Sequence, residues 1–344
     1  MNNPSKPSCC VLFTTDPTYL FPTLVSALQA RRHTSQHKAD VTIFCLELDQ
    51  QTAAVFAPLC ASVNIGLVAV DAGVVEGQSA MLARLFLDRF VPKHYTDYLY
   101  LDGDVHILDS LDPLIDIKLP RGSFLAANDP LTFLIGDRSR LSRQLRMHLS
   151  SLGLGEEESL QYFNSGVLRI CASGWKQIGQ EAWGHYKRIG GPSRFPDQDA
   201  LNLAGRGHRL PLSLVWNYPV FLRNSRLKTD IQPRVKHFMS SPKPWHGPFP
   251  PWTKSDCEPY LDALRTYPQL ASFQPIALSS RDRVLYRLQQ NGKRLVESVT
   301  WGLSKRRDRI LDYQATCLSL SRTFEPDLAH QRAHSPSPLT TFVA

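Results

Sequence analysis

The stretch Tyr98-Leu99-Tyr100-Leu101-Asp102-Gly103-Asp104-Val105 ends an apolar, aromatic run of strand length in two carboxylates, two residues apart. Carboxylates at the end of a buried strand are costly unless positive charge meets them, and hard oxygen ligands suit Mg²⁺ or Mn²⁺. In an extended chain Asp102 and Asp104 point the same way and can reach one ion, while Gly103 lets a ligand approach the backbone. We therefore expect a core strand that ends in a cation site open to a phosphate-bearing substrate. The alternative is an ordinary turn, for which Asp-Gly-Asp is also suitable.

The chain on both sides of this stretch alternates apolar runs with segments of helical periodicity. Strands are expected at 9–13, 41–48, 65–70, 98–101, 123–127 and 166–170, and helices at 20–32, 52–61 and 80–90. This alternation is typical of an α/β fold in which helices cover a parallel sheet and ligands bind beyond the carboxyl ends of the strands. The carboxylates at 102 and 104 follow one such end, and Thr14-Thr15-Asp16 follows another.

The composition indicates a globular chain with an anionic partner. The chain has 344 residues, 42% of them hydrophobic, and a formal net charge of +8. It has no apolar run of about 18 residues and no signal-peptide pattern, so we expect a cytoplasmic protein without a membrane span. Its seven cysteines form no CxxC pair, which indicates neither a disulfide framework nor a structural zinc site.

The positive charge is concentrated near the C-terminus. Over 281–313 apolar residues recur at helical spacing among arginines and lysines. We expect a basic amphipathic helical tail over 280–320 that binds an anionic membrane surface, or, alternatively, a helix packed on the domain with a solvated basic face. Residues 321–344 are expected to be disordered. Basic residues interleaved with aromatic ones on a sheet are not found, so no nucleic-acid partner is expected.

Three further segments place polar side chains beside apolar runs. Asn164-Ser165-Gly166 precedes a strand, Asp197-Gln198-Asp199 opens a helix, and His237 lies six residues before Lys243. Taken singly, these are a turn, a helix N-cap and a hydrogen-bonded histidine. Together with the carboxylates after residue 101 they resemble glycosyltransferase family 8, which holds the retaining sugar transferases of bacterial lipopolysaccharide, glycogenin and the galactinol synthases. The resemblance covers roughly residues 9–250 through YLDGDV, FNSGVL, DQDALN and HF…KPW, in the family's order.

The resemblance implies a GT-A-type fold with one nucleotide-binding, Rossmann-like mixed sheet. It implies a transferase domain over 9–275, with a nucleotide-binding half at 9–108 and an acceptor and sugar half at 109–275. The implied reaction is the retaining, metal-dependent transfer of glucose or galactose from a UDP-sugar to a glycan, lipid-linked or small hydroxyl acceptor. The implied setting is the synthesis of cell-surface polysaccharide such as lipopolysaccharide, at the inner face of the membrane.

The resemblance also assigns individual residues. Mn²⁺, or Mg²⁺ in its place, is held by Asp102, Asp104 and His237. The residues assigned to the uridine diphosphate are Thr14, Asp16, Arg84, Gly103, Ser240 and Lys243, with Thr18 at a base-contact position where some members have Asn. Ser240 stands where many members have Gly, and Lys243 neutralises the leaving diphosphate.

The remaining assigned residues act on the sugars. Gln198 stabilises an oxocarbenium-like species while the acceptor attacks from the leaving-group side, and Asp129 touches donor and acceptor. Asn164, Asp197 and Asn202 hold sugar hydroxyls. One rival is a haloacid-dehalogenase-like phosphatase, in which Thr or Val would stand in place of His106; another is an inactive, membrane-associated scaffold. We further expect deletion of 281–344 to weaken vesicle binding and to leave donor hydrolysis intact.

Overall fold

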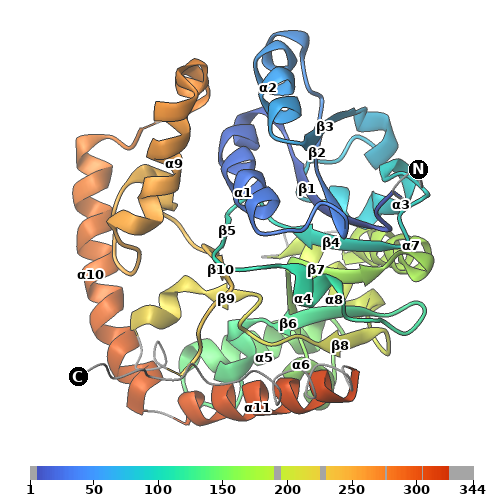
Figure 1. Cartoon of the computed structure of the whole chain (residues 1–344). Coiled ribbons are helices and arrows are strands. Elements are labelled where there is room, and N and C mark those ends of the chain that lie inside the picture. The colour runs from blue at the N-terminus through green and yellow to red at the C-terminus, as the bar shows by residue number, and fades with distance from the viewer. Residues whose placement is uncertain (1–5, 190–194, 225–229, 276, 304, 325–344) are drawn as a thin grey trace, which may run out of the picture.

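The computed structural model describes residues 6–189, 195–224, 230–275, 277–303 and 305–324, and its centre is a seven-stranded sheet in the order β3-β2-β1-β4-β7-β6-β8 (Figure 1). The strands are β1 (Cys9–Thr15), β2 (Ala39–Leu46), β3 (Ile65–Val70), β4 (Asp97–Leu101), β6 (Phe124–Asn128), β7 (Phe163–Cys171) and β8 (Arg209–Pro211). A second sheet joins β5 (Val105–Ile107), β10 (Val235–His237) and β9 (Tyr218–Pro219). Because β7 runs antiparallel to β4 and β6, the main sheet is mixed, as the family resemblance implied.

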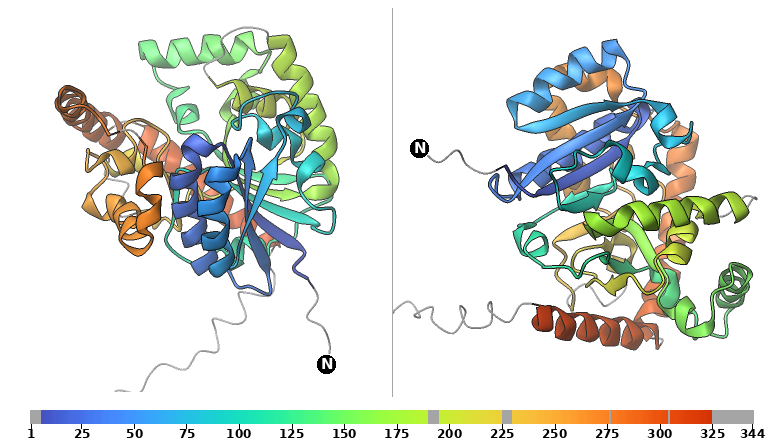
Figure 2. Two further views of the ribbon diagram at one scale, coloured as in Figure 1. Left: turned by 90° about the horizontal axis from the view of Figure 1, so that it is seen from above. Right: turned by 90° about the vertical axis from the view of Figure 1, so that its right-hand side faces the viewer.

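Helices cover both faces of the main sheet. They are α1 (Leu20–Arg32), α2 (Gln50–Ser62), α3 (Leu87–Phe90), α4 (Asp112–Ile115), α5 (Arg140–Ser151), α6 (Glu156–Leu160), α7 (Ala172–Ile189), α8 (Pro196–Ala204), α9 (Lys254–Thr266), α10 (Ser280–Leu303) and α11 (Arg306–Phe324). One core lies under α1, α2 and α9, and a second lies under α3, α7 and α8 (Figures 1 and 2). Strand β1 serves both cores, because Val11 and Phe13 enter the first and Cys10 and Leu12 the second. This α/β architecture confirms the predicted fold class.

The segment predicted as one helix over 80–90 differs from that prediction. It is a 3₁₀ turn at Ala83–Phe86 followed by the short helix α3. Helix α7 packs directly against its backbone. The Arg84 carbonyl accepts a hydrogen bond from Trp175 Nε1 at 2.9 Å, and the Leu85 carbonyl lies where a side chain at Gly179 would be. Packing against α7 therefore overrides the helical periodicity of the sequence.

The C-terminal region, predicted as a helical tail, consists of two helices joined to the domain. Helix α11 passes below the sheet (Figure 1), and the Tyr313 hydroxyl donates to the Leu212 carbonyl at 2.7 Å and accepts from the Asn128 N–H at 3.0 Å. Helix α11 continues to Phe324, past the expected boundary at 320, and residues 325–344, where disorder was predicted, lie outside the described residues. Among the residues that the structure describes, no helix is both long and apolar enough to cross a membrane.

Candidate active site

The sheet topology brings the sequence motifs together at one edge. The first residues of the antiparallel strand β7 lie beside the last residues of β4 and β6, and the Asp102 N–H donates to the Gly166 carbonyl at 2.8 Å. Asp129 follows β6 directly and donates its N–H to the Tyr162 carbonyl at 3.0 Å. Pairing of β10 with β5 places His237 opposite Val105. Motifs that are 135 residues apart in the sequence, those of Asp102 and His237, therefore face one space.

That space is a cavity of about 470 Å³. Its lining includes nine of the predicted site residues, namely Arg84, Asp102, Asp104, Asp129, Asn164, Asp197, Gln198, His237 and Ser240. It also has an apolar wall that the sequence did not predict, in which the rings of Phe221 and Trp301 lie 5.7 Å apart between centroids. A larger hollow of about 630 Å³, around Asp97 and Arg169, contains none of the predicted residues.

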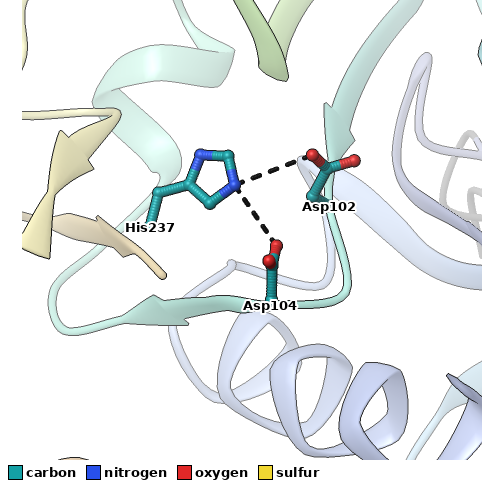
Figure 3. A group of neighbouring side chains, drawn as sticks. All are labelled: Asp102, Asp104 and His237. Carbon is teal, nitrogen blue, oxygen red and sulfur yellow. Dashed lines mark ion pairs between the residues drawn. The ribbon is translucent and has the colours of Figure 1, made fainter. Parts of the chain in front are cut away.

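Asp102, Asp104 and His237 form a compact ligand set (Figure 3). His237 Nε2 lies 3.2 Å from Asp104 Oδ1 and 3.7 Å from Asp102 Oδ2, and the three ligand atoms lie within 4.8 Å of one another. Two carboxylate oxygens and one imidazole nitrogen suit a divalent transition metal such as Mn²⁺, with Mg²⁺ as a weaker alternative for a nitrogen ligand. A donor set of this type, converging on one point, fits the expected cation.

Two cationic side chains and one hydroxyl group bind the carboxylates of Asp102 and Asp104. Asp102 Oδ1 accepts from Arg84 Nη2 at 2.8 Å and from the Tyr100 hydroxyl at 2.9 Å, and Lys243 Nζ lies 2.5 Å from Asp104 Oδ2. Burial raises the pKa of Asp104, but its charged and hydrogen-bonding partners, Lys243 above all, outweigh that effect and hold this pKa well below its ordinary value. The carboxylate therefore stays ionised and available to a metal.

The other end of the cavity is built from amides and a buried carboxyl. Gln198 Nε2 donates to Asp129 Oδ2 at 3.0 Å, Asn164 Nδ2 donates to Gln198 Oε1 at 3.0 Å, and the Ser165 N–H donates to Gln198 Oε1 at 3.2 Å. Burial raises the pKa of Asp129 despite the hydrogen bonds that it accepts from the Leu131 backbone N–H, Gln198 and Asn164. This end of the cavity suits neutral, hydrogen-bonding groups such as sugar hydroxyls.

Arg84, predicted as a phosphate contact, is the residue that joins the two ends. Besides Asp102, its guanidinium reaches the Ser165 carbonyl at 2.9 Å and Asp197 Oδ2 at 3.3 Å. Burial raises the pKa of Asp197, and the charge of Arg84 partly offsets this. Protein atoms thus satisfy most of the guanidinium donors, although its side chain still lines the cavity.

The residues predicted to contact the nucleotide that are not part of the cavity lining are Thr14, Asp16, Thr18, Gly103 and Lys243. The Thr14 hydroxyl lies 3.1 Å from the Tyr100 hydroxyl, and Asp16 Oδ1 caps the following turn by accepting from the Thr18 N–H at 2.9 Å. Gly103 packs against α1 so closely that a side chain there would overlap the Thr23 hydroxyl. This packing alone requires glycine at position 103, independently of any ligand.

Other residues differ from what the sequence indicated. Asn202 donates to the Phe163 carbonyl at 2.9 Å and to the Gln198 carbonyl at 2.8 Å, and accepts from the Phe163 N–H at 2.8 Å, so it ties α8 to β7 instead of presenting its amide to a sugar. Gly166 is needed because a side chain there would overlap His237. Tyr100 was missed, although its position two residues before Asp102 on a strand gives both side chains the same direction.

Comparisons with known proteins identify the family and the fold. The family model "Glycosyl transferase family 8" matches residues 10–248, whereas no curated protein matches significantly. Among solved structures, the galactosyltransferase LgtC in complex with donor and acceptor sugar analogues is 21% identical, with a TM-score of 0.58 over 80% of this chain and 99% of that one.

Two further solved structures share the fold. The bifunctional glycosyltransferase WbbM is 17% identical, with a TM-score of 0.62, and the glycosyltransferase GlyE of Streptococcus pneumoniae TIGR4 is 19% identical, with a TM-score of 0.54. Each match covers 80% of this chain, but only 53% of WbbM and 66% of GlyE, so this chain spans about half of the former. The fold is the GT-A fold of LgtC, and the family model covers well over half of the sequence. This chain is therefore a glycosyltransferase and belongs to glycosyl transferase family 8.

Proposed function

We propose that this glycosyltransferase moves glucose or galactose from a UDP-sugar to a hydroxyl of a glycan, lipid-linked or small acceptor, with retention of the anomeric configuration, in the synthesis of cell-surface polysaccharide. The convergence of Asp102, Asp104 and His237 at one end of a cavity with a polar opposite end carries this proposal. The likeness to LgtC, which was solved with donor and acceptor sugar analogues, supports the substrate class.

The charged end of the cavity is assigned to the diphosphate. A bound divalent cation would neutralise charge that develops on the leaving diphosphate. Lys243 lies beside Asp104 and supplies a second positive charge for the same leaving group. Thr14 and Asp16, at the end of β1, are assigned to the uracil, and Ser240 in the cavity lining is assigned to the phosphates.

The amide end is assigned to the reacting sugar. Gln198 Oε1 already accepts from Asn164 and the Ser165 N–H, so the amide is held in one orientation. An amide oxygen is a weak nucleophile, and its dipole is better suited to stabilising positive charge on the sugar carbon. Asp129 and Asp197 are assigned to sugar hydroxyls. Retention then follows if the acceptor attacks from the side that the diphosphate leaves.

Incubation of the purified protein with UDP-glucose, UDP-galactose and UDP-N-acetylglucosamine tests this proposal. UDP release should require Mn²⁺ or Mg²⁺, be fastest with one of the two hexose donors, and disappear with EDTA. Transfer to a simple glycoside acceptor should give a product with the donor's anomeric configuration by NMR. An inverted product would contradict the proposed retention, and absence of UDP release would favour the inactive scaffold. The phosphatase alternative is excluded by membership of the glycosyltransferase family.

We also propose that α10 docks on an anionic membrane, because this helix turns its apolar side away from the protein. Its inner side includes Gln290, which donates to the Ser241 carbonyl at 3.2 Å, and Trp301 in the cavity wall. Leu288 and Leu295 are 65% and 70% exposed. The exposed large apolar residues of this helix are Val284, Leu285, Leu288, Leu295, Val296 and Val299. Exposed basic side chains flank it, namely Arg281, Arg287, Lys293 and Arg294.

Deletion of 281–344 is not a clean test, because it would remove Trp301 from the cavity wall and Tyr313 from its bond to Asn128. A double substitution, Leu288→Ser with Leu295→Ser, should lower binding to phosphatidylglycerol-containing vesicles by roughly tenfold or more. The matched control is Leu141→Ser with Met147→Ser, which changes two exposed apolar residues on α5. Equal vesicle binding by both variants would contradict membrane docking by α10.

A further inference from the structure

A line of four buried side chains connects the sugar end of the cavity to the metal end. Asn164 Nδ2 lies 3.3 Å from Asp129 Oδ2, Asn217 Nδ2 lies 2.9 Å from Asn164 Oδ1, and Asn217 Oδ1 lies 2.9 Å from His237 Nδ1. All four residues are buried, and Asn217 is 1% exposed. Nothing in the sequence singled out Asn217, which lies in the loop before β9.

Main-chain chemistry fixes the direction of these hydrogen bonds. The Gly166 N–H can only donate, and it lies 3.1 Å from Asn164 Oδ1, so this atom is the acceptor oxygen of the amide. The same oxygen must then accept from the Asn217 amide, which therefore presents Nδ2 to Asn164. The oxygen of Asn217 is left to face His237, and only a protonated Nδ1 can donate to it.

This direction decides which nitrogen of His237 is available to a ligand. With the proton on Nδ1, the neutral imidazole has its lone pair on Nε2, which faces Asp104 Oδ1 at 3.2 Å and Asp102 Oδ2 at 3.7 Å. The lone pair and the two carboxylate oxygens are then three electron-pair donors that converge on one point, an arrangement that a bound cation would complete. A histidine that ligates a metal usually donates its other N–H to an acceptor that orients the ring.

We propose that Asn217 is the positioning residue of the cation site: its side-chain oxygen holds His237 in the Nδ1–H tautomer, so that Nε2 is the metal ligand. This inference rests on the proposed cation site. The Asn217 amide also donates to Asn164, whose own amide contacts Gln198 and Asp129, so the two ends of the cavity share one set of hydrogen bonds.

The first test needs no variant. In the metal-free wild-type protein, at a pH where the imidazole is neutral, ¹⁵N NMR of His237 should show protonated Nδ1 and unprotonated Nε2. A neutral imidazole with its proton on Nε2 would overturn the proposal.

The second test measures Mn²⁺ binding by EPR of the free ion, without substrate. Asn217→Leu keeps the shape of the side chain but removes the acceptor, and it should weaken Mn²⁺ binding about 10- to 100-fold. Asn217→Asp retains an oxygen for Nδ1–H, and it should bind Mn²⁺ no more weakly than the wild type. Wild-type affinity in Asn217→Leu would overturn this inference alone. Absence of Mn²⁺ binding in the wild type would overturn the cation site together with it.

Discussion

The two ends of the cavity treat buried carboxylates in opposite ways. After β4, Asp102 and Asp104 each meet a cation, Arg84 for the first and Lys243 for the second, and the pKa of Asp104 is held low. After β6, Asp129 meets amide and backbone N–H groups, and burial raises its pKa. Asp104 and Asp129 are both buried, at 9% and 6% exposed, so their neighbours decide the difference between their pKa values.

The comparison shows how one cavity can hold both halves of a nucleotide-sugar. A charge-compensated end suits an ionised diphosphate with its counter-ion, because no buried charge is left unpaired there. An amide-rich end suits hydroxyl groups, which need donors and acceptors rather than charge. Substitutions at the two ends should therefore impair different properties of the enzyme.

The largest effect is expected for Arg84→Met, because Arg84 is the cation that both ends share. Asp102 and Asp197 would lose their common buried partner, and an uncompensated buried charge costs roughly 3–5 kcal/mol of unfolding free energy. Urea unfolding at pH 7 measures this loss. The control is Arg89→Met, whose more exposed pair with Glu76 contributes at most about 1 kcal/mol. Equal losses in both variants would mean that Arg84 does not link the two ends.

Asp104→Asn should damage the charged end alone. Removing one carboxylate from the ligand set should lower kcat/KM about 10³-fold and weaken Mn²⁺ binding, while the isosteric amide preserves the packing. Steady-state kinetics with the preferred UDP-sugar and titration with Mn²⁺ measure the two effects. Asp116→Asn, at an exposed acid outside the cavity, is the matched control. A loss of less than tenfold in kcat/KM would argue against a cation at this position.

Asp129→Asn should damage the amide end alone, lowering kcat without weakening Mn²⁺ binding. The side-chain oxygen of Asn can still accept from Gln198 and Asn164, so we expect a loss of about 10- to 100-fold, expressed in kcat. Mn²⁺ affinity should stay at the wild-type value, because Asp129 is not one of the converging ligands. Weaker Mn²⁺ binding in this variant would show that the charge of Asp129 acts on the cation site through Asn164 and Asn217.

The sequence predicted the charged end better than the rest of the site. Asp102 and Asp104 are recognisable because they end an apolar run, whereas His237 was assigned through the family resemblance of its motif. Strand pairing then brings the three residues together. Asn217 and Trp301 could not be found in this way. Asn217 lies in a loop without a pattern, and the periodicity of the segment that contains Trp301 predicts a helix but not where tertiary packing places it.

Helix α10 shows a different limit of sequence reasoning. Its apolar periodicity correctly predicted a helix, but periodicity does not say which side faces the protein. In the structure a polar residue, Gln290, is on the buried side and Leu288 is exposed, the reverse of the usual arrangement. Groups outside the helix decide which side faces the protein: the Ser241 carbonyl accepts from Gln290, and the Asn224 amide donates to Glu297.

The smallest expected effect concerns the support of His237 from outside the cavity. Lys236, the residue before His237 on β10, lies 3.1 Å from buried Asp256 on α9, which also pairs with Arg223. Burial raises the pKa of Asp256, but the hydrogen bonds and charges of Arg223 and Lys236, with the Thr253 N–H, prevail and lower this pKa to about 2. The unfolded chain therefore binds a proton below pH 3.8 that the folded chain does not yet bind.

It follows that Asp256 stabilises the fold above pH 3.8 and that this contribution is lost as the pH falls through about 2. Asp256→Asn should lower the free energy of unfolding at pH 7 by at most about 2 kcal/mol, because solvent screens part of the attraction. Urea unfolding of both proteins at pH 7 and at pH 3 measures the effect. The difference should shrink at the lower pH, whereas Mn²⁺ affinity at pH 7 should not change. A difference independent of pH would mean that Asp256 acts through packing alone, and that the charge outside the cavity does not stabilise the strand that carries His237.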